Sequence, residues 1–473
     1  MLLHIARVVL ILFEVIVLFN LLIVVHELGH FLAARWRGLY IEKFGVWFGK
    51  PLWKKTINGV QYSLGSLPFG GFVALPQLAP MDIIEGKADL DRAKLPKISA
   101  LDKIIVAFAG PLFSLLLALF FAGIVWVTGH PVGEADSTTI IGYVAPDSPA
   151  QKVGLQPGDK ILAVDGKAVR RFVGMNDSVS WDVVRSEGDK IAVKFERSGK
   201  VQTVWVQPYK AETRGWRRKS VRQLLIYPAE TPIIDKVEPG TPAAAAGLQP
   251  RDIIRGFDHT PIYNPIALLE YISKHPKDQL VLHVERKGAR FDVPVKPTLL
   301  PTAGEMKPRI GIQWDTTGIM SISHPNPIEQ VYESVTSTLK TIGAVASPKS
   351  DVKLQHLSGP IGIGRIYYLL FQSERGWQLA LWFSVILNVN LAILNMLPIP
   401  VLDGGHIVLA IIESVRRKPV NMRVLEVVQT SCAALIIGYM LYITFFDVQD
   451  LPFVRKRLDQ LEGPTPATKA ETP

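Results

Sequence analysis

The stretch "LLIVVHELGHFLAARW", residues 21–36, places two histidines and a glutamate at the end of an apolar run. Ionisable groups at membrane depth are costly, so they are rare there unless they are paired or functional. The run begins at Val8, and comparable runs span residues 104–128, 377–402 and 427–446. Each approaches or exceeds the roughly 20 residues that a helix needs to cross a bilayer. The sequence therefore predicts a polytopic α-helical membrane protein with four transmembrane helices.

Composition and charge agree with this prediction. The 473 residues are 48% hydrophobic, and their mean hydropathy of +0.23 is high for a soluble protein. Basic residues gather in residues 31–103 and again between the third and fourth runs, so the positive-inside rule predicts that both loops are cytoplasmic. The net charge of +10 is therefore no sign of nucleic-acid binding. The single cysteine, Cys432, lies in the fourth run, so the domains outside the membrane have no disulfides.

A cleaved signal peptide is the alternative for the first run, because Arg7 precedes its apolar core. No small-residue cleavage site ends the run, and the histidine cluster follows directly, which favours a retained span.

The polar middle of the chain contains a repeat. "IIGYVAPDSPAQKVGLQPGDKILAV" from Ile140 aligns without gaps with "IIDKVEPGTPAAAAGLQPRDIIRGF" from Ile233, and Gly154 pairs with Gly247 at an offset of 247 − 154 = 93 residues. Two copies at a domain-sized period predict two tandem domains. The pattern resembles α/β PDZ domains of the bacterial protease type, which bind extended peptides by adding a strand to a sheet edge.

Two alternatives stay open for this middle region. The PDZ-like pair is either a peptide binder or a pair of spacers. If the turn at Gly142 binds carboxylates, Asp235 at the matching position makes the second copy the weaker candidate. The basic stretch 197–222 between the copies, which includes Arg214, is either a solvated linker face or a contact with lipid head groups.

His26-Glu27-Leu28-Gly29-His30 is an H-E-x-x-H motif. Positions four apart share one helix face, so both imidazoles can bind one metal ion. Zn²⁺ suits two imidazoles and a carboxylate, with a fourth position left for water. Glu27 lies beside that face and can act as the general base. The alternative is a chance motif on an ordinary helix, which its apolar setting disfavours.

The third ligand must come from elsewhere in the chain. "NMLPIPVLDGGH", residues 395–406, ends the third run; Pro398 and Pro400 stop the helix, and Asp403 follows on the cytoplasmic side. Unwound backbone at membrane depth is tolerated only inside protein or beside water, so Asp403 is best explained as a metal ligand. His406 is the weaker candidate and is expected to support the ligands or the structure.

H-E-L-G-H in the first span, together with N-x-x-P-x-P-x-x-D-G from Asn395, resembles the site-2 protease family of intramembrane zinc metalloproteases. With two PDZ-like domains the chain is similar to the bacterial type that acts in regulated proteolysis and the stress response. The resemblance implies His26, His30 and Asp403 as Zn²⁺ ligands and Glu27 as the general base. Asn395 matches the family asparagine that is thought to hold the substrate or the developing oxyanion, and Pro398 is expected to contact the substrate. Ser114 in "AGPLFS" departs from the usual asparagine, although a serine can still bond backbone carbonyls.

A substrate helix must unwind before it is cut, and its backbone groups then need partners. "WKKTINGVQYSL", residues 53–64, has two strand-like runs around Asn58-Gly59, a strong hairpin signal. Gly70 and Gly71 then allow close backbone approach. We therefore expect a membrane-associated β-hairpin that pairs with the substrate; a cytoplasmic surface hairpin is the alternative. Residues 325–347 are expected to form an amphipathic helix, with Ile328, Val331, Val335 and Leu339 on one face, either on the membrane surface or packed against the PDZ pair.

The expected layout runs through ten segments. They are helix 1 with the zinc motif (1–36), the β-hairpin loop (37–103), helix 2 (104–128), PDZ domain 1 (132–210), PDZ domain 2 (223–300), a linker with the amphipathic helix (301–376), helix 3 with the third ligand (377–404), a cytoplasmic loop (405–426), helix 4 (427–446) and an external tail (447–473).

The expected function is cleavage of single-pass membrane proteins, such as anti-sigma factors and signal-peptide remnants, in the bacterial inner membrane. The PDZ domains would be periplasmic and the active site near the cytoplasmic side. The rivals are a zinc hydrolase of lipid-like amides and a PDZ scaffold whose metal is structural.

Overall fold

The computed structural model describes residues 2–78, 95–96, 98–213, 215–302, 305–418 and 420–456. The chain forms two compact units. The first comprises the described residues of Met1–His130, Ser323–Thr341 and Leu357–Asp450, and the second those of Pro131–Ile322, Ile342–His356 and Leu451–Pro473. Arg214, residues 79–94 of the predicted loop and residues 457–473 of the predicted tail lie outside the described residues.

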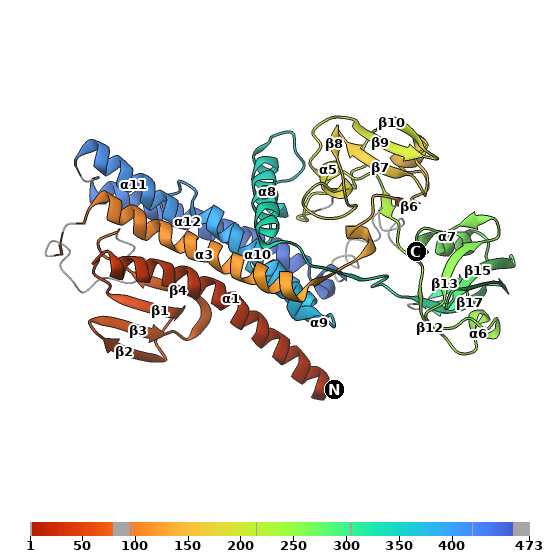
Figure 1. Ribbon diagram of the computed structural model, residues 1–473, viewed down its shortest axis with the longest axis horizontal. Coiled ribbons are helices and arrows are strands. Elements are labelled where there is room, and N and C mark those ends of the chain that lie inside the picture. The colour runs from red at the N-terminus through yellow and green to blue at the C-terminus, as the bar shows by residue number, and fades with distance from the viewer. Residues whose placement is uncertain are drawn as a thin grey trace. The chain divides into compact units, whose positions relative to one another are not determined.

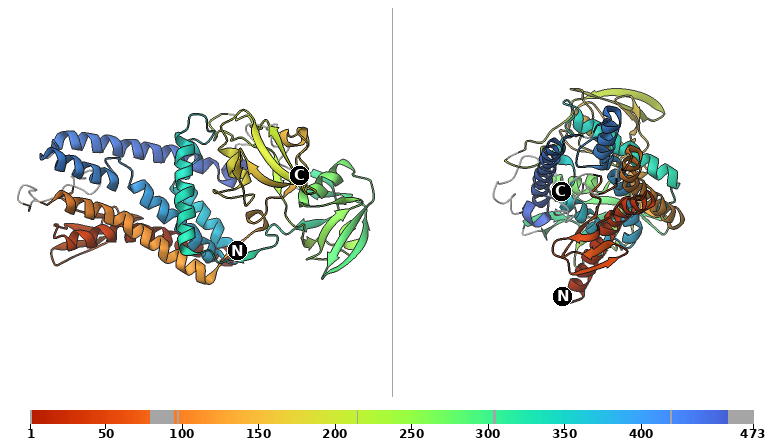
Figure 2. Two further views of the ribbon diagram at one scale, coloured as in Figure 1. Left: turned by 45° about the horizontal axis from the view of Figure 1, so that its top comes forward. Right: turned by 90° about the vertical axis from the view of Figure 1, so that its left-hand side faces the viewer.

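The first unit is built mainly from long apolar helices. Its helices are α1 (Leu2–Trp36), α3 (Ala100–Thr128), α9 (Pro360–Gln372), α10 (Gly376–Asn395), α11 (Asp403–Arg416) and α12 (Met422–Gln449). Within the described residues, four segments are long and apolar enough to cross a membrane: Ile5–Trp36, Ala100–Thr128, Gly376–Asn395 and Arg423–Gln449. This chain is therefore a membrane protein. Helix α3 lies against both α1 and α10 (Figures 1 and 2).

The third span differs from its expected range of 377–404. Helix α10 ends at Asn395, residues 396–402 are irregular, and α11 begins at Asp403. Pro398 and Pro400 in the irregular segment have no backbone N–H and cannot continue the helix. The third span and the segment that bears Asp403 are thus separate elements.

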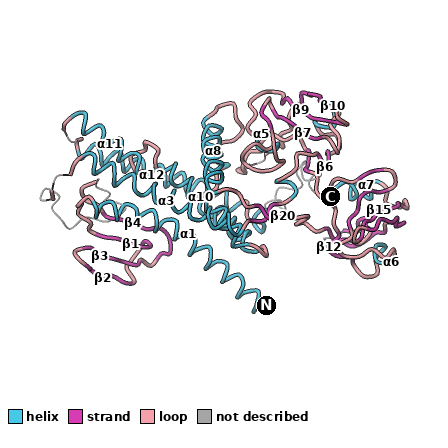
Figure 3. Tube along the Cα trace, viewed as in Figure 1, coloured by secondary structure: helices cyan, strands magenta, loops and turns pink. Residues whose placement is uncertain are grey.

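A four-stranded sheet, coloured magenta in Figure 3, packs against α1. Its order is β2-β3-β1-β4, with β1 (Lys43–Phe48), β2 (Trp53–Ile57), β3 (Val60–Leu64) and β4 (Leu67–Ala74). Strands β2 and β3 pair antiparallel around Asn58 and Gly59, whose φ values of +51° and +82° suit a tight primed turn. The Asn20 amide of α1 donates to the Pro68 carbonyl at 3.0 Å, which fixes the start of the outer strand β4 to the helix.

The second unit contains two β-domains with matching sheets. The first has β6 (Ile141–Val144), β7 (Lys160–Val164), β8 (Lys167–Ala168), β9 (Ile191–Arg197), β10 (Lys200–Val206) and β11 (Ile226–Pro228), with helices α4 (Pro149–Lys152) and α5 (Val179–Val184). The second has β12 (Ile234–Val237), β13 (Ile253–Phe257), β14 (Thr260–Pro261), β15 (Leu280–Arg286), β16 (Ala289–Val295), β17 (Thr298–Thr302), β18 (Glu305–Arg309) and β19 (Ile312–Trp314), with α6 (Pro242–Ala245) and α7 (Pro265–Lys274). Read from the shortest strand, their main sheets have the orders β8-β7-β9-β10 and β14-β13-β15-β16. Strands at corresponding places in the two copies thus have the same neighbours, so the sequence repeat is also a repeat of topology.

The repeat extends to the interior of each domain. Buried Asp159 is held by two hydrogen bonds of 2.6 Å from Arg197, and buried Asp252 is held by Arg286 at 2.6 and 2.7 Å. Each arginine also donates to the carbonyl of the helix-ending glycine, Gly154 or Gly247. The same ion pair therefore ties helix end to strand in both copies.

The expected domain boundaries 132–210 and 223–300 end too early. Strand β11 pairs antiparallel with β6, with Ile226 opposite Val144, so it belongs to the first domain. Strand β19 pairs with β12 in the same way, so the second domain extends to Trp314. Each domain completes its sheet with a strand that follows the repeated motif, and the repeat alone gave no sign of it.

Helix α8 (Pro327–Ala346) matches the expected amphipathic helix. Val331 and Val335 pack against the apolar helices of the first unit, whereas Ile328 and Leu339 are 69% and 56% exposed. The Gln330 amide donates to the Ala122 carbonyl of α3 at 3.0 Å. The N-terminal part of α8 is thus packed against the apolar helices of the first unit, an arrangement that the sequence did not predict.

Candidate metal centre

Helix α1 carries His26 and His30 on one face near its C-terminal end. The helix approaches α3 closely there, because a Cβ atom at Gly29 would lie 2.4 Å from the Ala109 carbonyl oxygen. A Cβ atom at Gly110 of α3 would lie 2.2 Å from His30 Nε2 and 2.8 Å from His26 Nε2. Two glycines therefore bring the helices together and leave room beside both imidazoles.

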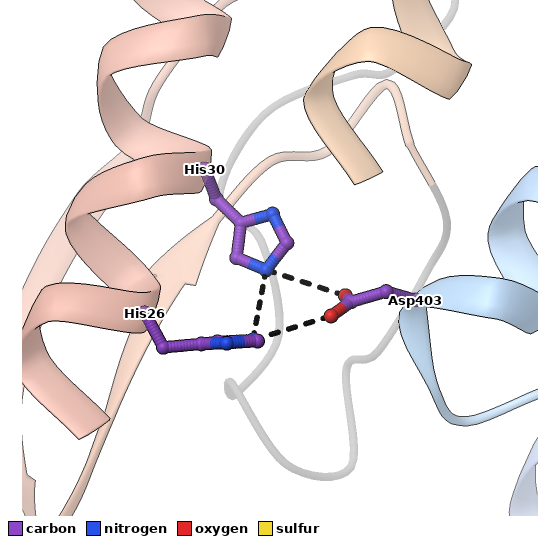
Figure 4. A group of neighbouring side chains, drawn as sticks. All are labelled: His26, His30 and Asp403. Carbon is purple, nitrogen blue, oxygen red and sulfur yellow. Dashed lines mark hydrogen bonds and ion pairs between the residues drawn. The ribbon is translucent and has the colours of Figure 1, made fainter. Parts of the chain in front are cut away.

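Asp403 reaches the histidines from the other end of the chain. It is the first residue of α11, directly after the irregular segment that follows Asn395. His26 Nε2 lies 3.2 Å from Asp403 Oδ2, and His30 Nε2 lies 3.3 Å from Asp403 Oδ1. The two Nε2 atoms are 3.2 Å apart. Figure 4 shows the three side chains pointing toward one another.

The far nitrogens of both imidazoles have partners of their own. His26 Nδ1 lies 3.0 Å from the Ser114 hydroxyl, and His30 Nδ1 lies 2.8 Å from the Val106 carbonyl oxygen. A carbonyl only accepts, so Nδ1 of His30 carries a proton and leaves the Nε2 lone pair for a metal. A hydroxyl both donates and accepts, so Ser114 permits the same tautomer at His26.

The donor set fits a metal ion. Among the described residues, His26, His30 and Asp403 form a group whose ligand atoms all lie within 4.8 Å of one another. Asp403 Oδ2 is buried without a hydrogen-bond partner, which is costly unless a cation occupies this point. Two imidazole nitrogens and a carboxylate with an open fourth position are the ligands of hydrolytic Zn²⁺ sites.

A cavity of about 250 Å³ adjoins this group. Glu27, Asn395 and His406 line it together with the three residues above. Val73 of β4 lines the cavity beside Glu27, and Asn395 Nδ2 lies 3.4 Å from His26 Nε2. The arrangement places the three candidate metal ligands, a carboxyl group and an amide donor around one cavity.

The remaining residues singled out from the sequence divide into two groups. Gly71 lines the cavity, and a Cβ atom there would lie 3.4 Å from the Glu27 side chain. Gly70 and Pro398 do not line it. Gly70 instead has φ +82° and leaves space for the Phe48 ring, so it shapes the sheet. Pro398 acts by ending α10.

Sequence reasoning missed the contacts that orient the imidazoles. The sequence indicates only that Ser114 can bond backbone carbonyls, whereas its hydroxyl bonds the ring of His26. The carbonyl of Val106 gives no signal in a sequence, because every residue has one. Phe72, Val73 and Leu75 also line the cavity, and nothing in their spacing distinguishes them from other strand residues.

The chain is similar in sequence to known proteins over most of its length. Peptidase family M50 matches residues 14–439. The regulator of sigma-E protease RseP of Escherichia coli is 28% identical over 436 residues, which cover 86% of this chain and 92% of that protein. The protein of the same name from Salmonella typhimurium is 27% identical over 435 residues, with the same coverage.

Among solved structures, the PDZ domain of an SdrC-like protein from Listeria monocytogenes covers 19% of this chain and 90% of that chain, at 20% identity. Its TM-score of 0.17 is too low to carry an argument about fold. The match to the protease family, in contrast, runs from residue 14 to residue 439 and therefore includes all three candidate metal ligands. This chain belongs to peptidase family M50, the protease family that its sequence predicts.

Proposed function

We propose that this protein is an intramembrane zinc metalloprotease that cleaves single-pass membrane proteins within or near their transmembrane segments. One observation carries the proposal: His26, His30 and Asp403 converge in a unit of membrane-spanning helices, beside a cavity that also holds Glu27. Soluble hydrolases have no need to place such a group among apolar helices. The relatives named regulator of sigma-E protease support the same reading.

His26, His30 and Asp403 would hold Zn²⁺ through the two Nε2 atoms and the carboxylate. When bound, Zn²⁺ lowers the pKa of a bound water to about 7 and polarises a carbonyl group. The Ser114 hydroxyl and the Val106 carbonyl keep both rings turned toward Asp403. These contacts fix the ligands before the ion arrives, which reduces the cost of ordering them on binding.

Glu27 is the general base in this proposal. Its carboxylate takes the proton of the attacking water and delivers it to the leaving amine of the cleaved peptide bond. Glu27 and Val73 of β4 line the same cavity, so the carboxyl group lies at the cavity wall. The Asn395 amide is a hydrogen-bond donor in the same cavity and suits the substrate carbonyl oxygen.

The substrate backbone would pair with strand β4. This strand is an outer member of its sheet, and Gly71, Phe72 and Val73 of β4 line the cavity. An unwound substrate segment placed along β4 gains main-chain hydrogen bonds that replace those of its own helix. Proline substitutions along residues 60–73 test this step, because proline removes a backbone donor. Normal cleavage by every such variant would exclude pairing with the sheet.

The two β-domains are, in this proposal, PDZ domains on the periplasmic side of a bacterial inner membrane. The metal centre then lies near the cytoplasmic side, as the basic loops at residues 31–103 and 416–423 suggest. The PDZ pair would admit substrates that have already lost their bulky external part, either by steric exclusion or by peptide binding. The substrates that we propose are anti-sigma factors and signal-peptide remnants.

The decisive experiment is cleavage of a single-span reporter by the purified chain in detergent. Wild type is compared with Glu27→Gln and Asp403→Ala, and the zinc content of each is determined. We expect wild type to cut, Glu27→Gln to retain zinc without cutting, and Asp403→Ala to lose zinc. Cleavage by Glu27→Gln would show that the H-E-x-x-H motif is not the catalytic centre. Hydrolysis of lipid-like amides without cleavage of any protein substrate would favour the lipid hydrolase, and full biological function of Glu27→Gln would favour a scaffold.

A further inference from the structure

His406 lines the same cavity as the metal-binding group but does not belong to that group. It is only 8% exposed, and its Nδ1 atom is buried without a hydrogen-bond partner among the described residues. A buried polar atom without a partner is unusual in a folded protein and calls for an explanation. The mechanism above leaves this side chain unused.

The backbone that carries His406 is held tightly. A Cβ atom at Gly404 would lie 2.3 Å from the Met396 carbonyl oxygen, and one at Gly405 would lie 2.1 Å from that of Ile399. The first turn of α11 therefore packs directly on the irregular segment after α10. Asp403 and His406 are three residues apart on this turn, so they share one helix face. The platform that positions the acidic member of the metal-binding group also positions His406.

The burial of Nδ1 favours one tautomer of the ring. An unpartnered buried N–H is rarer in proteins than an under-satisfied acceptor, so the proton is expected on Nε2. With Nδ1 enclosed, Nε2 and its neighbouring carbons are the ring atoms left to face the cavity. Burial is the largest cause that lowers the pKa of His406 from its usual value. Asp403 has a smaller, opposing effect on this pKa, and His30 and Lys103 lower it further. The side chain is then a neutral hydrogen-bond donor.

We propose that His406 is a further catalytic residue, whose Nε2–H donates a hydrogen bond to the carbonyl oxygen of the peptide bond that is cut. Negative charge develops on that oxygen when water adds to the carbonyl carbon, and a fixed donor in a dry site stabilises it. The Asn395 amide supplies a donor from α10, and His406 supplies one from α11. No proton leaves His406, so Glu27 remains the group that takes and returns the proton.

This inference rests on the proposed protease function, and its test separates the two. The cleavage assay is extended to His406→Gln, His406→Asn and His406→Leu, with Val408→Ala as a control on the exposed side of the same helix. The side-chain nitrogen of glutamine replaces Nε2, whereas that of asparagine replaces Nδ1. Zinc content, the midpoint of thermal unfolding, kcat and KM are measured for each variant.

We expect His406→Leu and His406→Asn to lower kcat by roughly 100- to 1,000-fold, as the loss of one such donor does elsewhere, with KM little changed. His406→Gln should recover most of the rate, and all variants should keep their zinc and their unfolding midpoint. Near-normal kcat in His406→Leu, or equal rates for the glutamine and asparagine variants, would overturn the proposal. Loss of zinc from His406→Leu would also overturn it, by giving His406 a role in metal binding. If wild type itself does not cut, the protease proposal fails and this one fails with it.

Discussion

The space beside Gly110 allows the metal-binding group to be tested without touching any of its members. Replacing Gly110 by alanine puts a methyl carbon 2.2 Å from His30 Nε2 and 2.8 Å from His26 Nε2. A Zn²⁺ ion bound to these atoms would lie about 2.0–2.1 Å from each. The added carbon therefore competes for the space that the ion needs, and ordinary contact at 3.4 Å or more requires the His30 ring to retreat by over 1 Å.

We expect Gly110→Ala to weaken zinc binding by at least about 100-fold, or roughly 2.7 kcal/mol. Losing one supporting contact of a ligand already costs 10- to 100-fold, and here a ligand itself is displaced. Alanine favours a helix more than glycine does, so α3 should persist. Zinc retained by the purified chain is measured against a series of chelator concentrations, together with cleavage of the reporter.

Gly123→Ala on the same helix is the matched control. A Cβ atom there has no heavy atom within 4 Å, so this variant should bind zinc and cut as wild type does. If Gly110→Ala also keeps normal zinc affinity, the ion does not bind between the two Nε2 atoms. The assignment of His26 and His30 as joint ligands would then be refuted.

Three further predictions concern single contacts within the two units. Ser114→Ala removes the hydroxyl beside the first imidazole and should weaken zinc binding about 10- to 100-fold, measured with the same chelator series; unchanged affinity would show that the contact does not orient the ligand. Arg197→Ala and Arg286→Ala each leave a buried aspartate unpaired and should destabilise their own β-domain by about 3–5 kcal/mol, measured by hydrogen exchange of the two sheets; loss of protection in the other domain would contradict this. The pKa of His283 is raised in the folded protein, mainly by a hydrogen bond to a backbone carbonyl. Protonated His283 therefore stabilises the fold fully at pH values below the pKa of the unfolded chain, about 6.5. This stabilisation is lost as the pH rises through the higher pKa of the folded state. The midpoint of thermal unfolding of the second β-domain should therefore fall over this range in wild type and fall less in His283→Gln.

The helices and the grouping of His26, His30 and Asp403 could be predicted because their signals are local or chemically rare. Long apolar runs permit few structures besides membrane-spanning helices, and histidines four apart beside a glutamate are unusual at membrane depth. Asp403 was recognisable because prolines mark the end of the helix before it. In these cases the residue types themselves limit the possible structures.

The closing strand of each β-domain could not be predicted in the same way. Ile226 and Ile312 lie outside the repeated motif, and their pairing with β6 and β12 depends on contacts between distant residues. The partners of the imidazoles were hidden for a related reason. A hydroxyl or carbonyl on α3 gains its role only when close helix packing brings it to a ring from α1. For His406 the sequence predicts only a supporting role, because no sequence pattern reveals a buried nitrogen without a hydrogen-bond partner.

The order of synthesis adds a consequence of having Asp403 so far from the two histidines. Asp403 follows His30 by 373 residues, and both β-domains are translated in between. At roughly 5–20 residues per second, the ribosome needs about 20–75 s to reach the aspartate after the histidines have emerged. A growing chain thus carries its first span into the membrane with an incomplete ligand set. The enzyme would be inactive throughout its own insertion. It could bind the metal ion and cut only after Asp403, in the last quarter of the chain, packs against His26 and His30 in the first quarter.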